Sequence, residues 1–337
     1  MKKGFGVIGV GLWGEYHAMT YAGYPGARLV AVCDVNAERA QQIAEKYGAE
    51  RWYTDYQELL ADDAIDAVTV ATPDYLHTEV GVAAAEAGKD VLMEKPLALT
   101  VADCQHIIEA AEKAGVKLMV DFHNRWSPPF NILKQRVTAG EMGDPLLINA
   151  RLNNTIFVPT EMLRWAGRSA TIWFTGSHLI DLVTWLIDSE VTRVYSVSRS
   201  RVLAGRGIDT PDFFETTLEF ANGAVAFVEN CWVLPNSEPH VVDFKMRLVG
   251  TEGSATIDTT HHGAIQCYTD EVVFPDILGL PQVFGEQKGF AVESIKYFAH
   301  CIIHDEVPMI TGQAGLVNTR IICAALESAK TGQPVDL

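Results

Sequence analysis

A lysine at the end of a short apolar run is the residue whose type and position point most directly to chemistry. The run covers residues 90–93 and leads into Glu94-Lys95-Pro96. If the run forms a strand of a parallel sheet, Lys95 lies at the carboxyl edge, where such sheets bind their ligands. Burial readily lowers the pKa of a lysine. We therefore expect Lys95 to exchange a proton beside a bound dinucleotide, while Glu94 faces the other way and orients other groups.

A glycine-rich turn near the N-terminus supplies the second chemical feature. Gly9, Gly11 and Gly14 fit the pattern G-x-G-x-x-G, after a strand-like run and before a helix-like run. In that context the first glycine permits a tight turn, the second lets backbone approach a pyrophosphate, and the third lets the helix pack on the strand. The positive helix end favours the phosphate charge. This pattern predicts a dinucleotide site that also includes Leu12 and Trp13.

Asp34 bears on which dinucleotide binds. It ends a strand-like run about twenty positions after Gly14, where an acid hydrogen-bonds the ribose hydroxyls of NAD. Its charge would repel the 2′-phosphate of NADP. Arg39 is nearby, but it lies a turn into the next helix. The sequence therefore predicts NAD rather than NADP.

Two further loops should face the same ligand. Thr72-Pro73-Asp74 follows another strand-like run, and His77 lies on the first turn of the next helix. His77 either contacts the cofactor or is a capping or surface histidine. The full set of expected cofactor-binding residues is Gly9, Gly11, Leu12, Trp13, Gly14, Asp34, Arg39, Thr72, Pro73, Asp74, His77, Glu94 and Lys95.

The elements that must position these residues alternate between strand and helix up to about residue 121. Strand-like runs are 5–10, 29–33, 67–71, 91–93 and 117–120; helix-like runs are 13–22, 37–47, 56–61, 76–87 and 101–114. Thr100 and Gly115 fit the caps of the last helix. Alternation of this kind predicts an α/β Rossmann domain with a parallel sheet, over residues 1–122.

The pattern changes in residues 123–337. A helix from Pro128-Pro129 to 139 is followed by strand-like runs at 146–153, 194–202, 213–220, 224–233, 241–249 and 254–258, with helices at 178–187, 290–304 and 313–331. Asn222-Gly223 is typical of a two-residue hairpin turn. This half is predicted to be an α+β domain with a large, mainly antiparallel open sheet.

Composition excludes several classes of function. The 337 residues are 48% hydrophobic and 20% charged, as in soluble globular proteins. With 26 basic against 43 acidic residues, the net charge is −17, so we expect neither nucleic acid nor a membrane as partner. The six cysteines form no C-x-x-C pair or zinc-ligand spacing, and His261-His262 is interpreted as a loop. We expect a cytoplasmic protein without a metal site.

These motifs together resemble the Gfo/Idh/MocA oxidoreductase family. The resemblance rests on Gly9-x-Gly11-x-x-Gly14, on Ala71-Thr72-Pro73-Asp74 with His77, and on Glu94-Lys95-Pro96. It extends to Asn124-Arg125-Trp126, Pro129-Phe130, Gly176-Ser177-His178-Leu179-Ile180-Asp181 and the ending 327–335. It implies a Rossmann domain followed by a sheet domain, and NAD- or NADP-dependent oxidation or reduction of sugars and cyclitols. It also implies a homodimer or homotetramer.

The resemblance places the catalytic lysine at Lys95 and the catalytic histidine at His178. Many members carry an aspartate four residues before that histidine, and this chain has Phe174 there. Asp181, three residues after His178, lies on the same helical face and could orient it, although an acid in a first turn also stabilises a helix on its own. A helix-start histidine at a packed interface is the alternative for His178.

The expected substrate is a small sugar or polyol. The residues we expect near it are Lys95, His123, Asn124, Arg125, Trp126, Trp165, Arg168, Trp173 and His178, with Arg164 as a further basic candidate. Aromatic faces suit the C–H faces of sugar rings, but each tryptophan alone is also compatible with a core position. Two other functions stay open: an enzyme that retains NAD and cleaves or eliminates through transient oxidation, and a non-catalytic nucleotide-responsive regulator.

Overall fold

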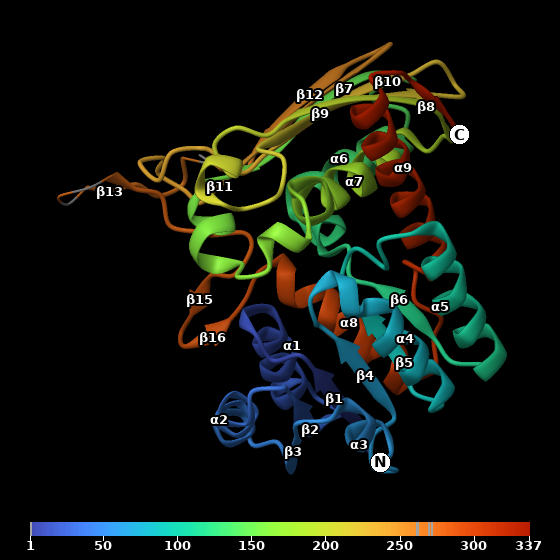
Figure 1. Ribbon diagram of the computed structural model, residues 1–337, viewed down its shortest axis with the longest axis vertical. Coiled ribbons are helices and arrows are strands. Elements are labelled where there is room, and N and C mark those ends of the chain that lie inside the picture. The colour runs from blue at the N-terminus through green and yellow to red at the C-terminus, as the bar shows by residue number, and fades with distance from the viewer. Residues whose placement is uncertain (1, 261–262, 269, 271) are drawn as a thin grey trace. The chain divides into compact units, whose positions relative to one another are not determined.

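The chain folds into two compact units (Figure 1). The computed structural model describes residues 2–260, 263–268, 270 and 272–337, so the loop expected at His261-His262 lies outside the described residues. One unit is Met1–His123 with Gln282–Thr319, and the other is Asn124–Pro281 with Arg320–Leu337. The first break falls one residue from the predicted boundary, but the segment 282–319 folds with the first unit rather than the second.

Helix α8 (Phe290–His304) explains why that late segment belongs to the first unit. It packs against α1 (Leu12–Gly23), and its Phe298 ring lies 6.4 Å from the ring of Phe5 on the first strand. Both rings are fully buried. The apolar face of α8 therefore completes the core of the first unit, a long-range pairing that residue order alone does not reveal.

A six-stranded parallel sheet forms the centre of the first unit. Its order is β3-β2-β1-β4-β5-β6. The strands are β1 Lys3–Ile8, β2 Ala27–Cys33, β3 Arg51–Tyr53, β4 Ala67–Val70, β5 Asp90–Met93 and β6 Leu118–Val120. The order reverses between β1 and β4, which is where such sheets bind nucleotides. Sequence analysis missed β3, because this three-residue edge strand is largely exposed and has no apolar run.

The helices of the first unit begin and end near the predicted residues. They are α1, α2 (Ala37–Tyr47), α3 (Tyr56–Leu60), α4 (His77–Glu86), α5 (Val101–Ala114), α8 and the first part of α9 (Gly312–Thr331). The predicted caps of α5 are confirmed: Thr100 accepts a hydrogen bond from the Asp103 N–H at 3.1 Å, and Gly115 has φ +69°. No helix in the described parts of the chain is long and apolar enough to cross a membrane.

The second unit contains a seven-stranded sheet in the order β12-β11-β7-β10-β9-β8-β17. Its strands are β7 Pro145–Asn154, β8 Val191–Arg199, β9 Phe213–Phe220, β10 Val225–Cys231, β11 Val242–Gly250, β12 Ser254–Asp258 and β17 Val335–Asp336. The β7–β10 pair is parallel and the other pairs are antiparallel. Helices α6 (Pro128–Thr138) and α7 (Ser177–Ile187) pack on this sheet (Figure 1). The predicted fold class is confirmed.

The chain also contains two small two-stranded sheets and a turn between β9 and β10. The sheets pair β13 (Cys267–Tyr268) with β14 (Val272–Val273), and β15 (Gln282–Val283) with β16 (Glu286–Gln287). The turn at Asn222-Gly223 differs from the prediction. The Phe220 N–H donates to the Ala224 carbonyl at 2.9 Å, so the loop has three residues. Gly223, at φ +86°, occupies the left-handed position that such loops require.

Candidate active site

The glycine turn between β1 and α1 has the geometry of a pyrophosphate cradle. At Gly9, with φ +86°, an added Cβ would lie 2.6 Å from the Ala71 carbonyl oxygen, and at Gly14 it would lie 1.8 Å from the Gly9 carbonyl oxygen. At Gly11 a Cβ would meet no described atom within 4 Å. Gly9 and Gly14 are therefore needed for close packing, while Gly11 borders open space.

The start of α1 is suited to an anion. No described side chain caps its first turn, so its N–H groups keep their positive potential. Leu12, at this helix start, is 60% exposed, and Trp13 follows half-buried. The open space at Gly11 and this uncapped turn together fit a dinucleotide pyrophosphate.

Asp34 lies at the end of β2 beside the same turn. Its carboxylate accepts hydrogen bonds from the Val10 N–H and the Asn36 N–H, both at 3.0 Å. These two bonds fix the carboxylate against the glycine turn while the side chain stays partly exposed. It can thus present its oxygen atoms to a ribose and its charge to any phosphate on that ribose.

Arg39 lies beside the glycine turn and is held by groups of the protein itself. Its guanidinium donates to the carbonyl oxygens of Val10 and Gly11, at 2.7 and 3.2 Å, and pairs with Glu15 at 2.5 Å. These bonds tie α2 to the glycine turn and to α1. Since its donors are used within the protein, we assign Arg39 a positioning role rather than a direct contact with cofactor.

His77 likewise positions a loop. Its ring is buried, with Nδ1 2.6 Å from the Pro96 carbonyl oxygen and Nε2 3.0 Å from the Thr72 carbonyl oxygen. Burial lowers the pKa of His77, so the ring carries one N–H and donates to one of the two carbonyls. His77 therefore joins the loop Thr72-Pro73-Asp74 to the Lys95-Pro96 loop, and its contact with the cofactor stays a prediction.

Lys95 follows β5 at the carboxyl edge of the sheet, as the sequence predicted. The side chain is partly buried, and the peptide bond to Pro96 is cis. Burial lowers the pKa of Lys95 to about 8, although the charges of Glu94, Asp74 and Asp121 raise it. An amine with this pKa is available as a base near neutral pH.

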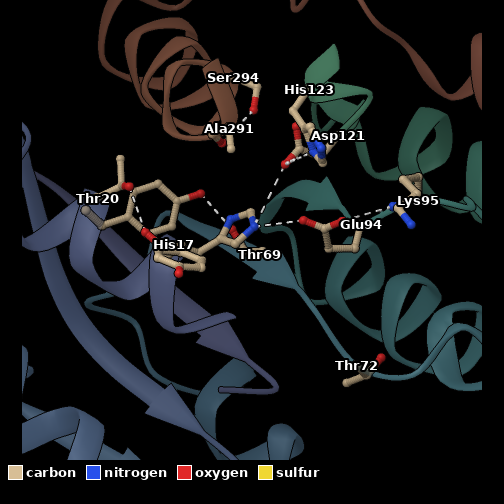
Figure 2. Close-up of polar contacts among 12 residues, drawn as sticks. His17, Thr20, Thr69, Thr72, Glu94, Lys95, Asp121, His123, Ala291 and Ser294 are labelled. Atoms are coloured by element: carbon tan, nitrogen blue, oxygen red, sulfur yellow. Dashed lines mark hydrogen bonds and ion pairs between the residues drawn. The ribbon is translucent and has the colours of Figure 1, made fainter. Parts of the chain in front are cut away.

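Glu94 joins a buried cluster, which Figure 2 shows beside Lys95. Its Oε1 lies 2.9 Å from Nε2 of His17 on α1, and the same His17 atom lies 3.9 Å from Oδ2 of Asp121, just after β6. His17 and Asp121 have no exposed surface. We refer to His17, Glu94 and Asp121 as the buried acid cluster.

The groups of this cluster have strongly shifted pKa values. Burial raises the pKa of Glu94 to about 7, against the opposing charge of Lys95. Burial and the charge of Glu94 raise the pKa of Asp121 well above its usual range. Burial lowers the pKa of His17 to about 4, although the charge of Asp121 raises it. The imidazole is therefore neutral at physiological pH.

His123 also lies beside this cluster. It is buried, its ring stacks on Trp13 with centroids 5.0 Å apart, and its Nδ1 lies 4.0 Å from Asp121 Oδ2. Burial, Lys95 and His17 together lower the pKa of His123 to about 3. A neutral His123 next to Trp13 is compatible with the ligand-contacting role that we expected.

In the second unit, His178 lies on the first turn of α7. It is buried, and a π-helical turn, Ile172–Gly176, leads directly into the helix. Such turns are frequent at functional sites. The carboxylate of Asp181 does not rely on His178 for a partner. Both of its oxygen atoms accept hydrogen bonds from Arg125, at 2.9 and 2.5 Å.

The Arg125–Asp181 ion pair revises two expectations. The Arg125 guanidinium, expected to bind substrate, holds Asp181 and lies over the Trp185 ring, 5.5 Å from its centroid. Asp181 is buried, and burial raises its pKa against the effect of Arg125. The pair thus joins the segment before α6 to α7. Only the Arg125 N–H groups that do not bind Asp181 can face a ligand.

The predicted aromatic residues fall into two groups. Trp173 is 6% exposed and belongs to the core, as the alternative interpretation allowed. Trp165 and Phe174 are half-buried with ring centroids 6.5 Å apart, and the Phe174 ring lies 5.9 Å from that of the fully buried Trp232. Phe174 therefore packs in an aromatic cluster and brings neither a charge nor an acidic proton.

The other predicted substrate residues differ in exposure. Trp126 is half-buried, Asn124 is buried, and Arg164 and Arg168 are exposed.

Sequence analysis missed two members of the buried acid cluster, His17 and Asp121. Each carried a usable signal. Asp121 directly follows an apolar strand at the same sheet edge as Lys95, and His17 lies three residues after Gly14 on α1. Polar residues at those positions face the interior behind the nucleotide site, so their burial follows from the topology once the strand order is known.

Comparison with known proteins agrees with this geometry. Residues 3–122 match the oxidoreductase family with an NAD-binding Rossmann fold, GFO_IDH_MocA, and residues 130–256 match the GFO/IDH/MocA C-terminal domain. The scyllo-inositol 2-dehydrogenase (NAD(+)) of Bacillus subtilis is 31% identical over 98% of this chain and 95% of its own. The inositol 2-dehydrogenase of Salmonella typhimurium is 32% identical over 77% of this chain and 75% of its own.

The same fold occurs in solved structures. The crystal structure of myo-inositol 2-dehydrogenase from Lactobacillus plantarum superposes with a TM-score of 0.86 at 21% identity, over 100% of both chains. Identity at that level supports the fold and carries no statement about substrate. The first unit is accordingly an NAD-binding Rossmann fold.

Proposed function

The chain belongs to the Gfo/Idh/MocA oxidoreductase family, and on that premise we propose that it is an NAD-dependent dehydrogenase for a secondary hydroxyl of an inositol or a closely related polyol. The observation that carries the proposal is Lys95. Its partly buried amine, with a pKa lowered to about 8 chiefly by burial, lies at the carboxyl edge of the NAD-binding sheet. The names of the two inositol dehydrogenase relatives favour a cyclitol over other sugars.

The residues of the first unit have distinct parts in this reaction. Gly9, Gly11 and the start of α1 would hold the pyrophosphate of NAD, and Asp34 would accept hydrogen bonds from its ribose. NAD, when bound, supplies the hydride acceptor. Lys95, as the neutral amine, removes the hydroxyl proton of the substrate as the C–H bond breaks, which is general base catalysis.

His178 is the second proton-handling residue in the proposal. The support comes from its match to the family motif and from its buried place after a π-helical turn. Phe174 cannot accept or donate a proton, so the aspartate that many relatives pair with this histidine has no counterpart at that position. Lys95 therefore carries a larger share of the proton transfer.

The test is NADH formation over a panel of myo-inositol, scyllo-inositol, chiro-inositol and simple hexoses. We expect turnover with at least one inositol and with NAD well above NADP. Release of a cleaved or eliminated product without net NADH would replace this proposal by the NAD-retaining enzyme. NAD binding with no turnover on any polyol would replace it by the regulator. Size-exclusion chromatography with light scattering tests the homodimer or homotetramer that the family resemblance implies.

A further inference from the structure

The buried acid cluster presents an unusual problem of charge. Two carboxyl groups and one imidazole lie together behind Lys95, with His17 and Asp121 fully buried and Glu94 7% exposed. Figure 2 shows these side chains converging from α1, the end of β5 and the end of β6. If both carboxyl groups were ionised, two negative charges would lie near a single ammonium group. Burying the second, uncompensated charge costs several kcal/mol.

One proton therefore resides in the cluster, and the contacts indicate where. The neutral His17 donates its Nε2–H to Glu94 Oε1 at 2.9 Å, which favours a charge on Glu94. Its Nδ1 then carries no proton and needs no acceptor, and within the described part of the chain it has no hydrogen-bond partner. Glu94 also accepts a hydrogen bond from the backbone N–H of Lys95, at 3.3 Å. For Asp121, burial and the charge of Glu94 outweigh the effects of His17 and Ser294, so its pKa stays well above the usual range.

A metal ion is a weaker account of the same three side chains. In a tetrahedral zinc site with bonds of about 2.0–2.1 Å, two ligand atoms lie about 3.3 Å apart. His17 Nε2 and Glu94 Oε1 are 2.9 Å apart, which is an ordinary hydrogen-bond distance. The imidazole and the carboxylate are therefore bonded to each other.

We propose that the buried acid cluster keeps one proton on Asp121 and one negative charge on Glu94, and that Glu94 is thereby the positioning residue that sets the pH at which Lys95 loses its proton. This inference rests on the proposed role of Lys95 as base. Without the charge of Glu94, burial would leave the amine neutral over most of the physiological range and unable to return a proton in the reverse reaction. With it, Lys95 changes its protonation near neutral pH.

Other groups also face this pair from the surrounding elements. Helix α1 contributes His17 and Tyr21, and the segment after β6 contributes Asp121 and His123. The segment after β4 contributes Asp74, and the first residue of α4 is His77. From α8, the described group that acts on Asp121 is the uncharged Ser294. Of these, Asp74 and Asp121 are the other acids whose charges raise the pKa of Lys95, and Asp74 is not a member of the cluster. The substitutions below do not change Asp74, so its effect on the pKa of Lys95 is the same in every variant.

The test measures the titration of Lys95 itself, without substrate. The full-length protein is labelled with acetic anhydride at a series of pH values, and acetylation of Lys95 is quantified by mass spectrometry. In Glu94→Gln we expect the midpoint to fall by about one pH unit or more, since the charge of Glu94 is the one that most raises the pKa of Lys95 and a nearby opposite charge is worth about one to three units. Asp121→Asn, which replaces a neutral acid by a neutral amide, leaves the midpoint within about 0.3 units.

Two further variants separate charge from folding. Glu94→Asp keeps the charge and restores the midpoint towards that of the parent protein, whereas His17→Leu removes the donor to Glu94 and lowers the midpoint without changing residue 94. Glu109→Gln, an exposed acid on α5, is the matched control and changes nothing. Thermal melts identify any variant that does not fold, and His17→Leu then replaces Glu94→Gln as the deciding variant.

Three results would overturn the inference: an unchanged midpoint in folded Glu94→Gln, an equal fall in Asp121→Asn, or a stoichiometric divalent metal in the purified protein that EDTA removes. These outcomes are independent of the proposed function. A protein that oxidises inositol with an unchanged Lys95 midpoint in Glu94→Gln retains the function and loses the inference. A protein that oxidises no polyol but has a lower Lys95 midpoint in Glu94→Gln loses the proposed function and retains the inference.

Discussion

Two glycines of the turn after β1, Gly11 and Gly14, should respond to alanine in opposite ways. At Gly11 an added Cβ meets no described atom within 4 Å, and the φ of −62° suits any residue. We therefore expect Gly11→Ala to change the free energy of unfolding by less than about 0.5 kcal/mol. At Gly14 the Cβ would lie 1.8 Å from the Gly9 carbonyl oxygen. That clash requires α1 to move, so we expect a loss of about 1–3 kcal/mol.

The effect of Gly11→Ala should appear in cofactor binding instead. The methyl group would occupy the space where the pyrophosphate approaches the backbone. Losing one hydrogen bond to a charged group costs about 1.5–3 kcal/mol, which corresponds to an increase of about 10- to 100-fold in the Kd for NAD. Isothermal titration calorimetry measures the Kd, and urea unfolding measures the stability.

Gly23→Ala is the matched control. Gly23 ends the same helix, is exposed, and a Cβ there meets nothing within 4 Å. We expect unchanged NAD affinity and equal or slightly higher stability, since alanine favours helix by up to about 1 kcal/mol over glycine. If Gly11→Ala binds NAD as tightly as Gly23→Ala does, the turn is not the pyrophosphate site and the reasoning from open space fails.

Further predictions concern three other charged residues, Asp34, Lys95 and Asp181. Asp34→Asn should raise the preference for NADP over NAD by about tenfold, measured as the ratio of the two Kd values, because it removes the charge that faces a 2′-phosphate. Lys95→Met should lower kcat by about 10²–10⁴-fold with NAD affinity changed less than about threefold. In the parent protein, kcat/KM for oxidation should rise with pH and level off above about 8, because the base must be the neutral amine; a flat profile would contradict its role. Asp181→Asn should cost about 3–5 kcal/mol in urea unfolding by leaving Arg125 unpaired in its buried site, and combining Asp181→Asn with Arg125→Met should cost less than the sum of the two single changes.

Local patterns were sufficient to predict most elements of the chain. The glycine turn, the caps of α5 at Thr100 and Gly115, and the prolines that begin α6 all act within a few residues of themselves. Hydrophobic runs likewise identified five of the six strands of the parallel sheet, because strands that are buried on both faces need apolar residues throughout. The exposed edge strand β3 lacks that requirement, so its sequence carries no such signal.

Long-range pairings were not predictable in the same way. Arg39 was expected among the cofactor-binding residues because it lies near Asp34, but its partners include carbonyl oxygens on the turn 28 and 29 positions earlier. Arg125 and Asp181 are 56 positions apart, and nothing local in either segment indicates their ion pair. Sequence analysis identified chemically capable side chains, but only the fold shows which of them are already used within the protein.

Phe174 bears on the roles that we propose for both His178 and Lys95. Where many relatives have an aspartate that can share a proton with the histidine, this chain has an aromatic ring packed against Trp165 and Trp232. That ring can shape a binding surface, but it leaves the second unit without an acid four residues before His178. The group that tunes the base in our proposal, Glu94, belongs instead to the buried acid cluster, whose three members all lie in the first unit.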